Sequence, residues 1–189
     1  MDSRVTITQR IDAVTLVTTD RFTDAPPAPR SVKIELTGRC NYRCGFCALR
    51  TRAVQPKGDM DPALFRKITR QMRNAGVEEI GVFYLGESLM APQLAVDAIR
   101  WCKEIGFPYV FLTTNGSLCS PAVAEGLFKA GLDSLKFSVN AGTDEQFEEV
   151  MGVRSKLYRN ALGNLKTTRL LRDALRPECG LYASSIRYD

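Results

Sequence analysis

Histidine is absent from this chain of 189 residues. Every mechanism that uses imidazole as a general base, a general acid or a metal ligand is therefore excluded. The exclusion covers Ser-His-Asp and Cys-His hydrolases as well as zinc sites that include histidine. Any catalytic or metal-binding activity must come from other side chains.

Long hydrophobic runs are also missing. No stretch of about 18 apolar residues occurs, so the sequence predicts no transmembrane helix. The residues after Met1 do not form a basic region followed by an apolar stretch, as a secretory signal would. We expect a soluble, cytoplasmic protein without a membrane partner.

Repeats and low-complexity segments are absent as well, and the composition is that of a globular domain. Hydrophobic residues make up 44% of the chain and charged residues 25%, which excludes a disordered tail or a collagen-like repeat. The 26 lysine and arginine residues exceed the 21 acidic residues, giving a formal net charge of +5. This mild basic balance suits an anionic ligand without demanding nucleic acid, and we expect no nucleic-acid partner.

A proline-rich segment, residues 24–30, divides the chain into a leader and a core. In the leader, residues 1–30 with this linker included, β-branched residues at 5–8 and 13–19 predict a hairpin or an edge strand. The core, residues 31–189, alternates between strand and helix patterns. Its predicted strands cover residues 32–37, 79–85, 109–114, 133–140 and 181–186, and its predicted helices begin near residues 61, 92, 120, 143 and 156.

Strands that alternate with helices through short loops predict an α/β fold. The strands of such a fold are parallel and their crossover connections are right-handed. In parallel sheets the ligand site lies beyond the carboxyl ends of the strands, because the loops converge there. Candidate functional residues are therefore expected at those ends.

Cysteine is the residue type that stands out in the core. The chain has six cysteines, and without an export signal we expect no disulfide framework, because the cytosol keeps thiols reduced. Cys40, Cys44 and Cys47 follow the first predicted strand on a short loop. The remaining cysteines are interpreted as buried or incidental thiols, namely Cys102, Cys119 and Cys179.

Three thiols at these spacings can converge on one inorganic centre. A structural zinc site needs four ligands, and the chain offers neither histidine nor a second clustered pair of cysteines for the fourth. A cubane iron–sulfur cluster held by three cysteines is chemically sensible, because its fourth iron is then open to bind a substrate or a cofactor. An iron that is open in this way indicates a cluster that binds a substrate or a cofactor.

The pattern Cys40-x-x-x-Cys44-x-x-Cys47, with Phe46 before the last cysteine and the first strand directly ahead, resembles the radical S-adenosylmethionine superfamily. The resemblance implies a partial (βα) barrel, with five βα units visible in this chain. It implies a [4Fe-4S] cluster held by the three cysteines, with S-adenosylmethionine bound at the open iron. One-electron cleavage of the sulfonium would then give a 5′-deoxyadenosyl radical that abstracts hydrogen from the substrate.

Further turns at the ends of successive predicted strands match the same family. Gly86 and Glu87 lie in a turn similar to the family's Gly-Gly-Glu turn, with Leu85 in place of the first glycine. The resemblance implies that this turn's backbone and acid hold the methionine amino group. Residues 113–117, Thr-Thr-Asn-Gly-Ser, resemble a turn common in the branch that matures peptides, molybdopterin and quinones.

The end of the fourth predicted strand supplies a polar pair. Ser138 and Asn140 are two residues apart, so they point to the same side of a strand. They are similar to the pair that contacts the ribose and the carboxylate of the family's cofactor. The cofactor-binding residues that the resemblance implies are Phe46, Gly86, Glu87, Ser138 and Asn140.

The motifs do not identify the substrate. The resemblance implies a small-molecule or peptide substrate and a one-electron donor such as flavodoxin or ferredoxin. Because relatives usually have six βα units and this chain ends after the fifth predicted strand, we expect the core to be incomplete at its C-terminus. Two alternatives are a zinc or iron–sulfur binding module without turnover, and a remnant of the enzyme fold that serves only as a binding partner.

Overall fold

The computed structural model describes residues 18–50 and 58–186, together with residues 9 and 12. A single sheet of five strands runs through this part of the chain in the order β1-β2-β3-β4-β5, and every neighbouring pair is parallel. The strands are β1 (Ser31–Lys33), β2 (Glu79–Gly81), β3 (Tyr109–Thr114), β4 (Ser134–Ser138) and β5 (Gly180–Ser184). The sheet confirms the predicted α/β fold and the partial barrel of five βα units. The hairpin expected at 5–8 and 13–19 lies almost wholly outside the described residues.

The helices occupy the connections between the strands. In residues 18–50 and 58–186, the α-helices are α2 (Pro62–Asn74), α3 (Pro92–Glu104), α4 (Pro121–Lys129), α5 (Asp144–Met151) and α6 (Lys156–Leu175), and the short 3-10 helices are η1 (Thr19–Arg21), η2 (Ala48–Arg50) and η3 (Ser88–Met90). Asp61, Ser120 and Thr143 each accept a hydrogen bond from the backbone N–H three residues later. These caps satisfy amides of the first turn that have no partner within the helix, so α2, α4 and α5 begin where the sequence predicts.

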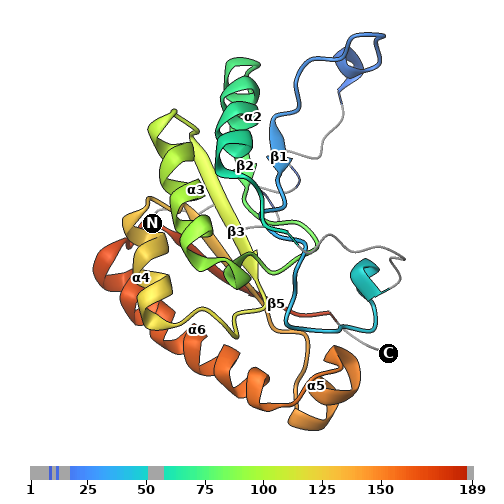
Figure 1. The fold of residues 1–189 in the computed structure, drawn as a ribbon, viewed down its shortest axis with the longest axis vertical. Coiled ribbons are helices and arrows are strands. Elements are labelled where there is room, and N and C mark those ends of the chain that lie inside the picture. The colour runs from blue at the N-terminus through green and yellow to red at the C-terminus, as the bar shows by residue number, and fades with distance from the viewer. Residues whose placement is uncertain (1–8, 10–11, 13–17, 51–57, 187–189) are drawn as a thin grey trace.

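Helices α2, α3, α4 and α6 gather on one side of the sheet (Figure 1). The main core lies between these helices and the strands, and β3 displays the alternation that results. Val110, Leu112 and Thr114 are buried, whereas the intervening residues of β3 are partly exposed. We call the opposite side of the sheet, which carries these intervening residues, the inner face. No helix in the described part of the chain combines the length and the apolar character that crossing a membrane requires.

Strand β1 is shorter than the predicted strand over 32–37 because the chain changes partners after it. The C=O of Leu36 accepts the N–H of Met60 at 2.7 Å, and Thr37 forms an antiparallel bridge with Asp59. Residues 36–37 thus pair with a later loop and not with β2. This pairing turns the following segment away from the sheet.

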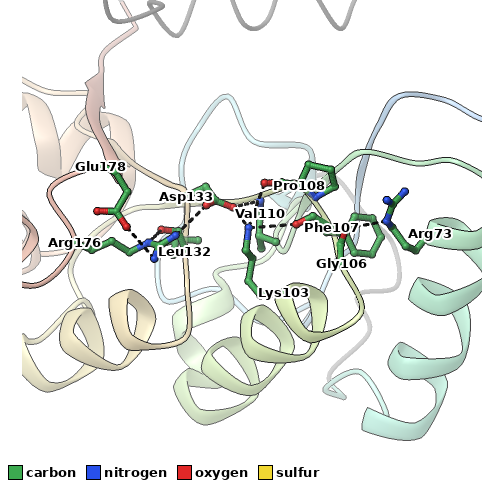
Figure 2. Close-up of polar contacts among 10 residues, drawn as sticks. All are labelled: Arg73, Lys103, Gly106, Phe107, Pro108, Val110, Leu132, Asp133, Arg176 and Glu178. Carbon is green, nitrogen blue, oxygen red and sulfur yellow. Dashed lines mark hydrogen bonds and ion pairs between the residues drawn. The ribbon is translucent and has the colours of Figure 1, made fainter. Parts of the chain in front are cut away.

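The amino ends of the strands are joined by an ionic network around Asp133, which directly precedes β4 (Figure 2). One carboxylate oxygen of Asp133 accepts Lys103 Nζ and the backbone N–H of Val110, both at 2.8 Å, and the other accepts Arg176 Nη2 at 3.1 Å. Arg176 also donates to the C=O of Leu132 at 2.8 Å. The side chain of Asp133 is only 17% exposed. The network therefore fastens α3, β3, β4 and the end of α6 to one another.

Candidate functional site

The loop that carries the cysteine motif lies beyond the carboxyl ends of the strands, beside α5 (Figure 1). Two of its amides hold it there, because Arg43 N–H donates to the C=O of Met151 at 3.0 Å and Gly45 N–H to the C=O of Val150 at 2.8 Å. Gly152, the residue after α5, has a left-handed backbone with φ of 63° and ends the helix. A Cβ there would also lie 3.0 Å from the C=O oxygen of Arg43. The loop is thus attached to the last turn of α5 by two backbone hydrogen bonds.

Aromatic packing against α5 and α6 also holds the cysteine loop in place. Tyr42, between the first two cysteines, is buried, and its ring meets the ring of Phe147 edge-on at 5.3 Å between centroids. Phe147 in turn stacks on Tyr158 at 5.1 Å, and Tyr158 donates its hydroxyl hydrogen to the C=O of Ala141. Cys40 and the second cysteine of the motif pack against this small cluster. The motif loop is therefore supported by α5 and α6 as well as by β1.

The three motif thiols are free and partly exposed. The pKa values of Cys40 and Cys44 are raised to about 11, chiefly by burial, and the charge of Cys47 contributes to both shifts. The N–H of Cys47 donates to the C=O of Cys44 at 3.1 Å, and Cys40 and Cys44 pack against the same aromatic cluster, so the three thiols belong to one tightly turned segment. Within the described residues, no three Cys, Asp or Glu side chains close in around a single metal ion. A cubane cluster distributes its three thiolates over separate irons, so this donor set fits such a cluster and lacks the four ligands of a structural zinc site.

The turn after β2 is built around the side chain of Glu35. Its Oε1 accepts the N–H groups of Leu85 and Gly86 at 3.0 and 2.8 Å. Strand β2 ends at Gly81, earlier than the predicted 79–85, and the C=O of the next residue, Val82, accepts the hydroxyl hydrogen of Ser88 at 2.7 Å. Gly86 is required by close packing, because a Cβ there would lie 1.9 Å from the C=O oxygen of Thr37. No described residue other than glycine has a positive φ, so the backbone at Leu85 is one that leucine adopts without strain.

Glu87 is buried beneath this turn and joins it to the end of β3. Its Oε1 accepts Leu89 N–H at 3.0 Å and the hydroxyl hydrogen of Thr114 at 2.8 Å, and its Oε2 accepts Asn115 N–H at 2.7 Å. The side chain is only 4% exposed, and burial raises its pKa although these hydrogen bonds act in the opposite direction. Glu87 also donates its own N–H to the C=O of Arg39, directly before the first cysteine.

Three side chains connect the cysteine loop to the turn after β3. Asn41 donates to Ser117 Oγ at 2.9 Å, Asn115 donates to Asn41 Oδ1 at 2.8 Å, and Ser117 donates its hydroxyl hydrogen to Asn115 Oδ1 at 2.8 Å. The ring is closed, so each member orients the other two. From α6, Asn164 donates to the C=O of Gly116 at 2.8 Å. These contacts hold the cysteine loop and the turn at residues 113–117 in one fixed arrangement.

A family model described as the radical SAM superfamily matches residues 34–173 of this chain. The chain belongs to the radical SAM superfamily. The match begins directly after β1 and runs through the cysteine motif into α6, so it includes the loop and turns described above.

Among curated radical SAM relatives, a probable GTP 3′,8-cyclase of Thermococcus kodakarensis is 31% identical over 126 residues, 65% of this chain and 39% of that protein. A PqqA peptide cyclase of Methylobacterium nodulans is 27% identical over 129 residues, 68% of this chain and 33% of that protein. The chain therefore spans between a third and two fifths of the length of these relatives.

Two solved structures share the fold. Native anSMEcpe with bound AdoMet aligns with a TM-score of 0.64 at 16% identity, over 81% of this chain and 42% of that one. Streptococcus suis SuiB bound to precursor peptide SuiA aligns with a TM-score of 0.63 at 22% identity, over 77% of this chain and 31% of that one. At these identities the likeness establishes the fold alone.

The remaining residues that the radical SAM resemblance implies lie around the same end of the sheet. Phe46 is 49% exposed on the cysteine loop. Ser138 ends β4 in register with Ser184, and Asn140 accepts the N–H of Ile186 at 3.1 Å. Asn140 thereby fastens the segment after β5 to the end of β4. The structure thus places all of the expected positions on loops or strand ends at the carboxyl edge of the sheet.

The cysteines outside the motif are buried in the core, which confirms their interpretation as buried thiols. Burial raises the pKa of Cys102, Cys119 and Cys179 to about 12. Each is at most 1% exposed. Buried thiols with raised pKa values are poorly reactive, because the thiolate is the form that binds metals.

Replacing Glu87 with glutamine is expected to lower the free energy of unfolding by about 1.5–3 kcal/mol. Both carboxylate oxygens accept protein donors, so either orientation of the amide places its NH₂ group against an N–H or O–H. Urea unfolding of this variant and of Glu125→Gln, whose side chain is on the exposed surface of α4, measures the difference. Equal stability of the two variants would contradict the role of Glu87 as the link between the two turns.

Proposed function

We propose that this chain is a radical SAM enzyme that reductively cleaves S-adenosylmethionine and uses the resulting radical to abstract hydrogen from a substrate. The observation that carries the proposal is the set of three free thiols on one tightly turned loop that is hydrogen-bonded at the carboxyl edge of the sheet. Family membership supports it. We place the catalytic core at residues 31–189 and regard residues 1–30 as a separate leader.

Cys40, Cys44 and Cys47 would hold the [4Fe-4S] cluster. When bound, the cluster and S-adenosylmethionine supply one-electron cleavage of the sulfonium bond and a 5′-deoxyadenosyl radical. The chain's own contribution is to position them. The closed ring that includes Asn41 keeps the cysteine loop at a fixed place relative to the neighbouring turns.

The turn at Gly86 and Glu87 is proposed to bind the methionine amino group. Because both carboxylate oxygens of Glu87 already accept protein donors, we assign the direct contact to the backbone of the turn and make Glu87 a positioning residue. Ser138 and Asn140 are proposed to contact the ribose and carboxylate of the cofactor, and Phe46, half-exposed on the cysteine loop, is proposed to contact it as well.

The substrate is proposed to be a peptide or a small molecule. The relatives named above include a PqqA peptide cyclase and a probable GTP 3′,8-cyclase, and SuiB was solved with a precursor peptide. We propose a flavodoxin or a ferredoxin as the one-electron donor. Activity with a nicotinamide cofactor alone, without a small redox protein or dithionite, would contradict the donor assignment.

Replacing any one of Cys40, Cys44 and Cys47 with alanine is expected to abolish the brown colour of the protein after anaerobic reconstitution, because each thiolate binds a separate iron. The wild-type chain should take up about four irons and, with dithionite, convert S-adenosylmethionine to 5′-deoxyadenosine. Iron analysis, visible absorption and chromatography of the product measure these effects.

The matched control is Cys102→Ala, which removes a buried thiol of α3. Its iron content should equal that of the wild type below its unfolding temperature. A requirement for a cysteine outside the motif would overturn the ligand assignment. Colourless protein with bound zinc would support the binding-module alternative. Iron uptake without formation of 5′-deoxyadenosine would support the cluster assignment and contradict the proposed activity.

A further inference from the structure

We propose that the inner face of the sheet binds an anionic group of the substrate, a carboxylate or a phosphate, between Lys33 of β1 and Lys136 of β4. The inference deepens the proposed function, since it names the chemistry that the substrate presents to the sheet. It rests on strand register, on the contact of Lys33 with an aromatic ring, and on the absence of a carboxylate partner of Lys136 among the described residues.

Strand register places Lys136 close to the cofactor end of the inner face. It is in register with Thr113 of β3 and Tyr182 of β5, so the three side chains share that face. Lys136 precedes Ser138 by two residues, which corresponds to about 7 Å along the strand. A group held at Lys136 would therefore lie one step deeper than the proposed cofactor contacts at the strand end.

Lys33 belongs to the same face on the opposite edge of the sheet. It is in register with Gly81, which is in register with Phe111. The ammonium of Lys33 lies 5.6 Å from the centroid of the Phe83 ring, and this ring meets the Phe111 ring edge-on at 5.7 Å. A Cβ at Gly81 would lie 2.9 Å from both rings, so only glycine leaves them room. The aromatic pair thus supports Lys33 and supplies apolar surface beside it.

The charge of Lys136 is not compensated by the described part of the chain. Lys136 is half-buried, and no carboxylate of the described residues lies within ion-pair distance of it. Burial lowers its pKa, and the positive charge of Lys33 lowers it further. A partly buried cation without a counter-charge is costly, and a bound anion removes that cost.

Two acidic residues in or near β1 and β2, Glu35 and Glu79, do not act as the counter-charge of Lys136. Glu35, two residues after Lys33, is engaged with the N–H groups of Leu85 and Gly86 through Oε1. Glu79 lies at the start of β2, in register with Tyr109 and away from the end where Lys136 lies. The two lysines therefore form a local positive site on this face.

The test is an anion titration of the full chain, followed by its thermal unfolding midpoint and by calorimetry. Inorganic phosphate and acetate are titrated separately at constant ionic strength, set with chloride so that non-specific screening is the same throughout. A specific anion site raises the midpoint in a saturable way, because the anion binds the folded state only. The variants are Lys136→Met, Lys33→Met and, as a matched control on the exposed surface of α2, Lys67→Met.

We expect phosphate or acetate to raise the unfolding midpoint of the wild type. The anion that does so indicates whether the substrate group is a phosphate or a carboxylate. Lys136→Met should weaken binding at least tenfold and raise the midpoint in the absence of anion, because it removes an uncompensated charge while keeping the side-chain volume. Lys33→Met should weaken binding to a smaller extent, and Lys67→Met should bind like the wild type.

The proposal is overturned if neither anion raises the wild-type midpoint. It is also overturned if Lys136→Met lowers the midpoint and leaves the anion response unchanged, since Lys136 would then have a partner within the chain. The titration needs neither cluster nor S-adenosylmethionine. A wild-type chain that forms no 5′-deoxyadenosine would contradict the proposed function while leaving the anion result in place.

Discussion

Replacement of Asp133 with asparagine is expected to lower the free energy of unfolding by about 3 kcal/mol. Asp133 accepts hydrogen bonds from Lys103, Val110 and Arg176, and its removal as an anion leaves two partly buried cations facing a neutral amide. The side chains of Lys103 and Arg176 are 28% and 23% exposed, so water replaces the lost charge only in part. Urea unfolding followed by circular dichroism measures the loss.

Glu178→Gln is the matched control for this prediction. Glu178 pairs with the same Arg176 at 3.0 Å, but its side chain is 62% exposed (Figure 2). An exposed ion pair contributes little, so the control should change stability by less than about 1 kcal/mol. Because Asp133 lies at the amino ends of the strands, neither variant should change iron uptake at temperatures where it is folded. Similar losses in the two variants would show that Asp133 does not dominate the network.

Gly86→Ala is expected to produce the second large effect, a loss on the order of 3 kcal/mol together with a marked fall in iron uptake. The added Cβ would lie 1.9 Å from the C=O oxygen of Thr37 and 3.0 Å from that of Arg39, so the neighbours that must move belong to the backbone. Moving them breaks the hydrogen bond from Glu87 N–H to the C=O of Arg39. Arg39 directly precedes the first cysteine, which is why metal uptake is affected as well.

Gly163→Ala tests whether these effects are specific to the site. Gly163 lies in the middle of α6 with no atom within 4 Å of an added Cβ, so alanine there should raise the free energy of unfolding by about 0.5–1 kcal/mol. Unfolding midpoints and iron content of both variants are measured in parallel. Normal iron uptake by Gly86→Ala would mean that the turn and the cysteine loop are positioned independently.

The order of strands and helices could be predicted because each element carries a local signal. Asp61 before proline marks the start of α2, and the apolar run at 109–114 coincides with β3. The ends of β1 and β2 could not be predicted in the same way. The chain beyond each of these strands is held by distant residues, since Met60 pairs with Leu36 and the Glu35 side chain accepts the amides of the turn after β2.

For the site, the sequence indicated which residues are involved but not how they are held together. The cysteine spacing is a local pattern, and so is the Gly86–Glu87 turn. By contrast, nothing in the sequence marks Asn41 or Asn164, whose partners are more than 45 residues away along the chain. The burial of the Glu87 side chain could not be predicted from the sequence either, because a carboxylate at a strand end is ordinarily solvated.

The attachment of the cysteine loop to α5 creates a thermodynamic linkage between a helix and a metal site. The N–H groups of Arg43 and Gly45 are bonded to carbonyls of the last turn of α5, so fraying of that turn releases the loop. A cluster that binds only the attached loop therefore stabilises the end of α5 against fraying, and its binding free energy is added to the free energy of fraying. Amide hydrogen exchange at Arg43, Gly45 and Gly152 would then slow on cluster assembly, which makes these protons reporters of assembly that require no substrate.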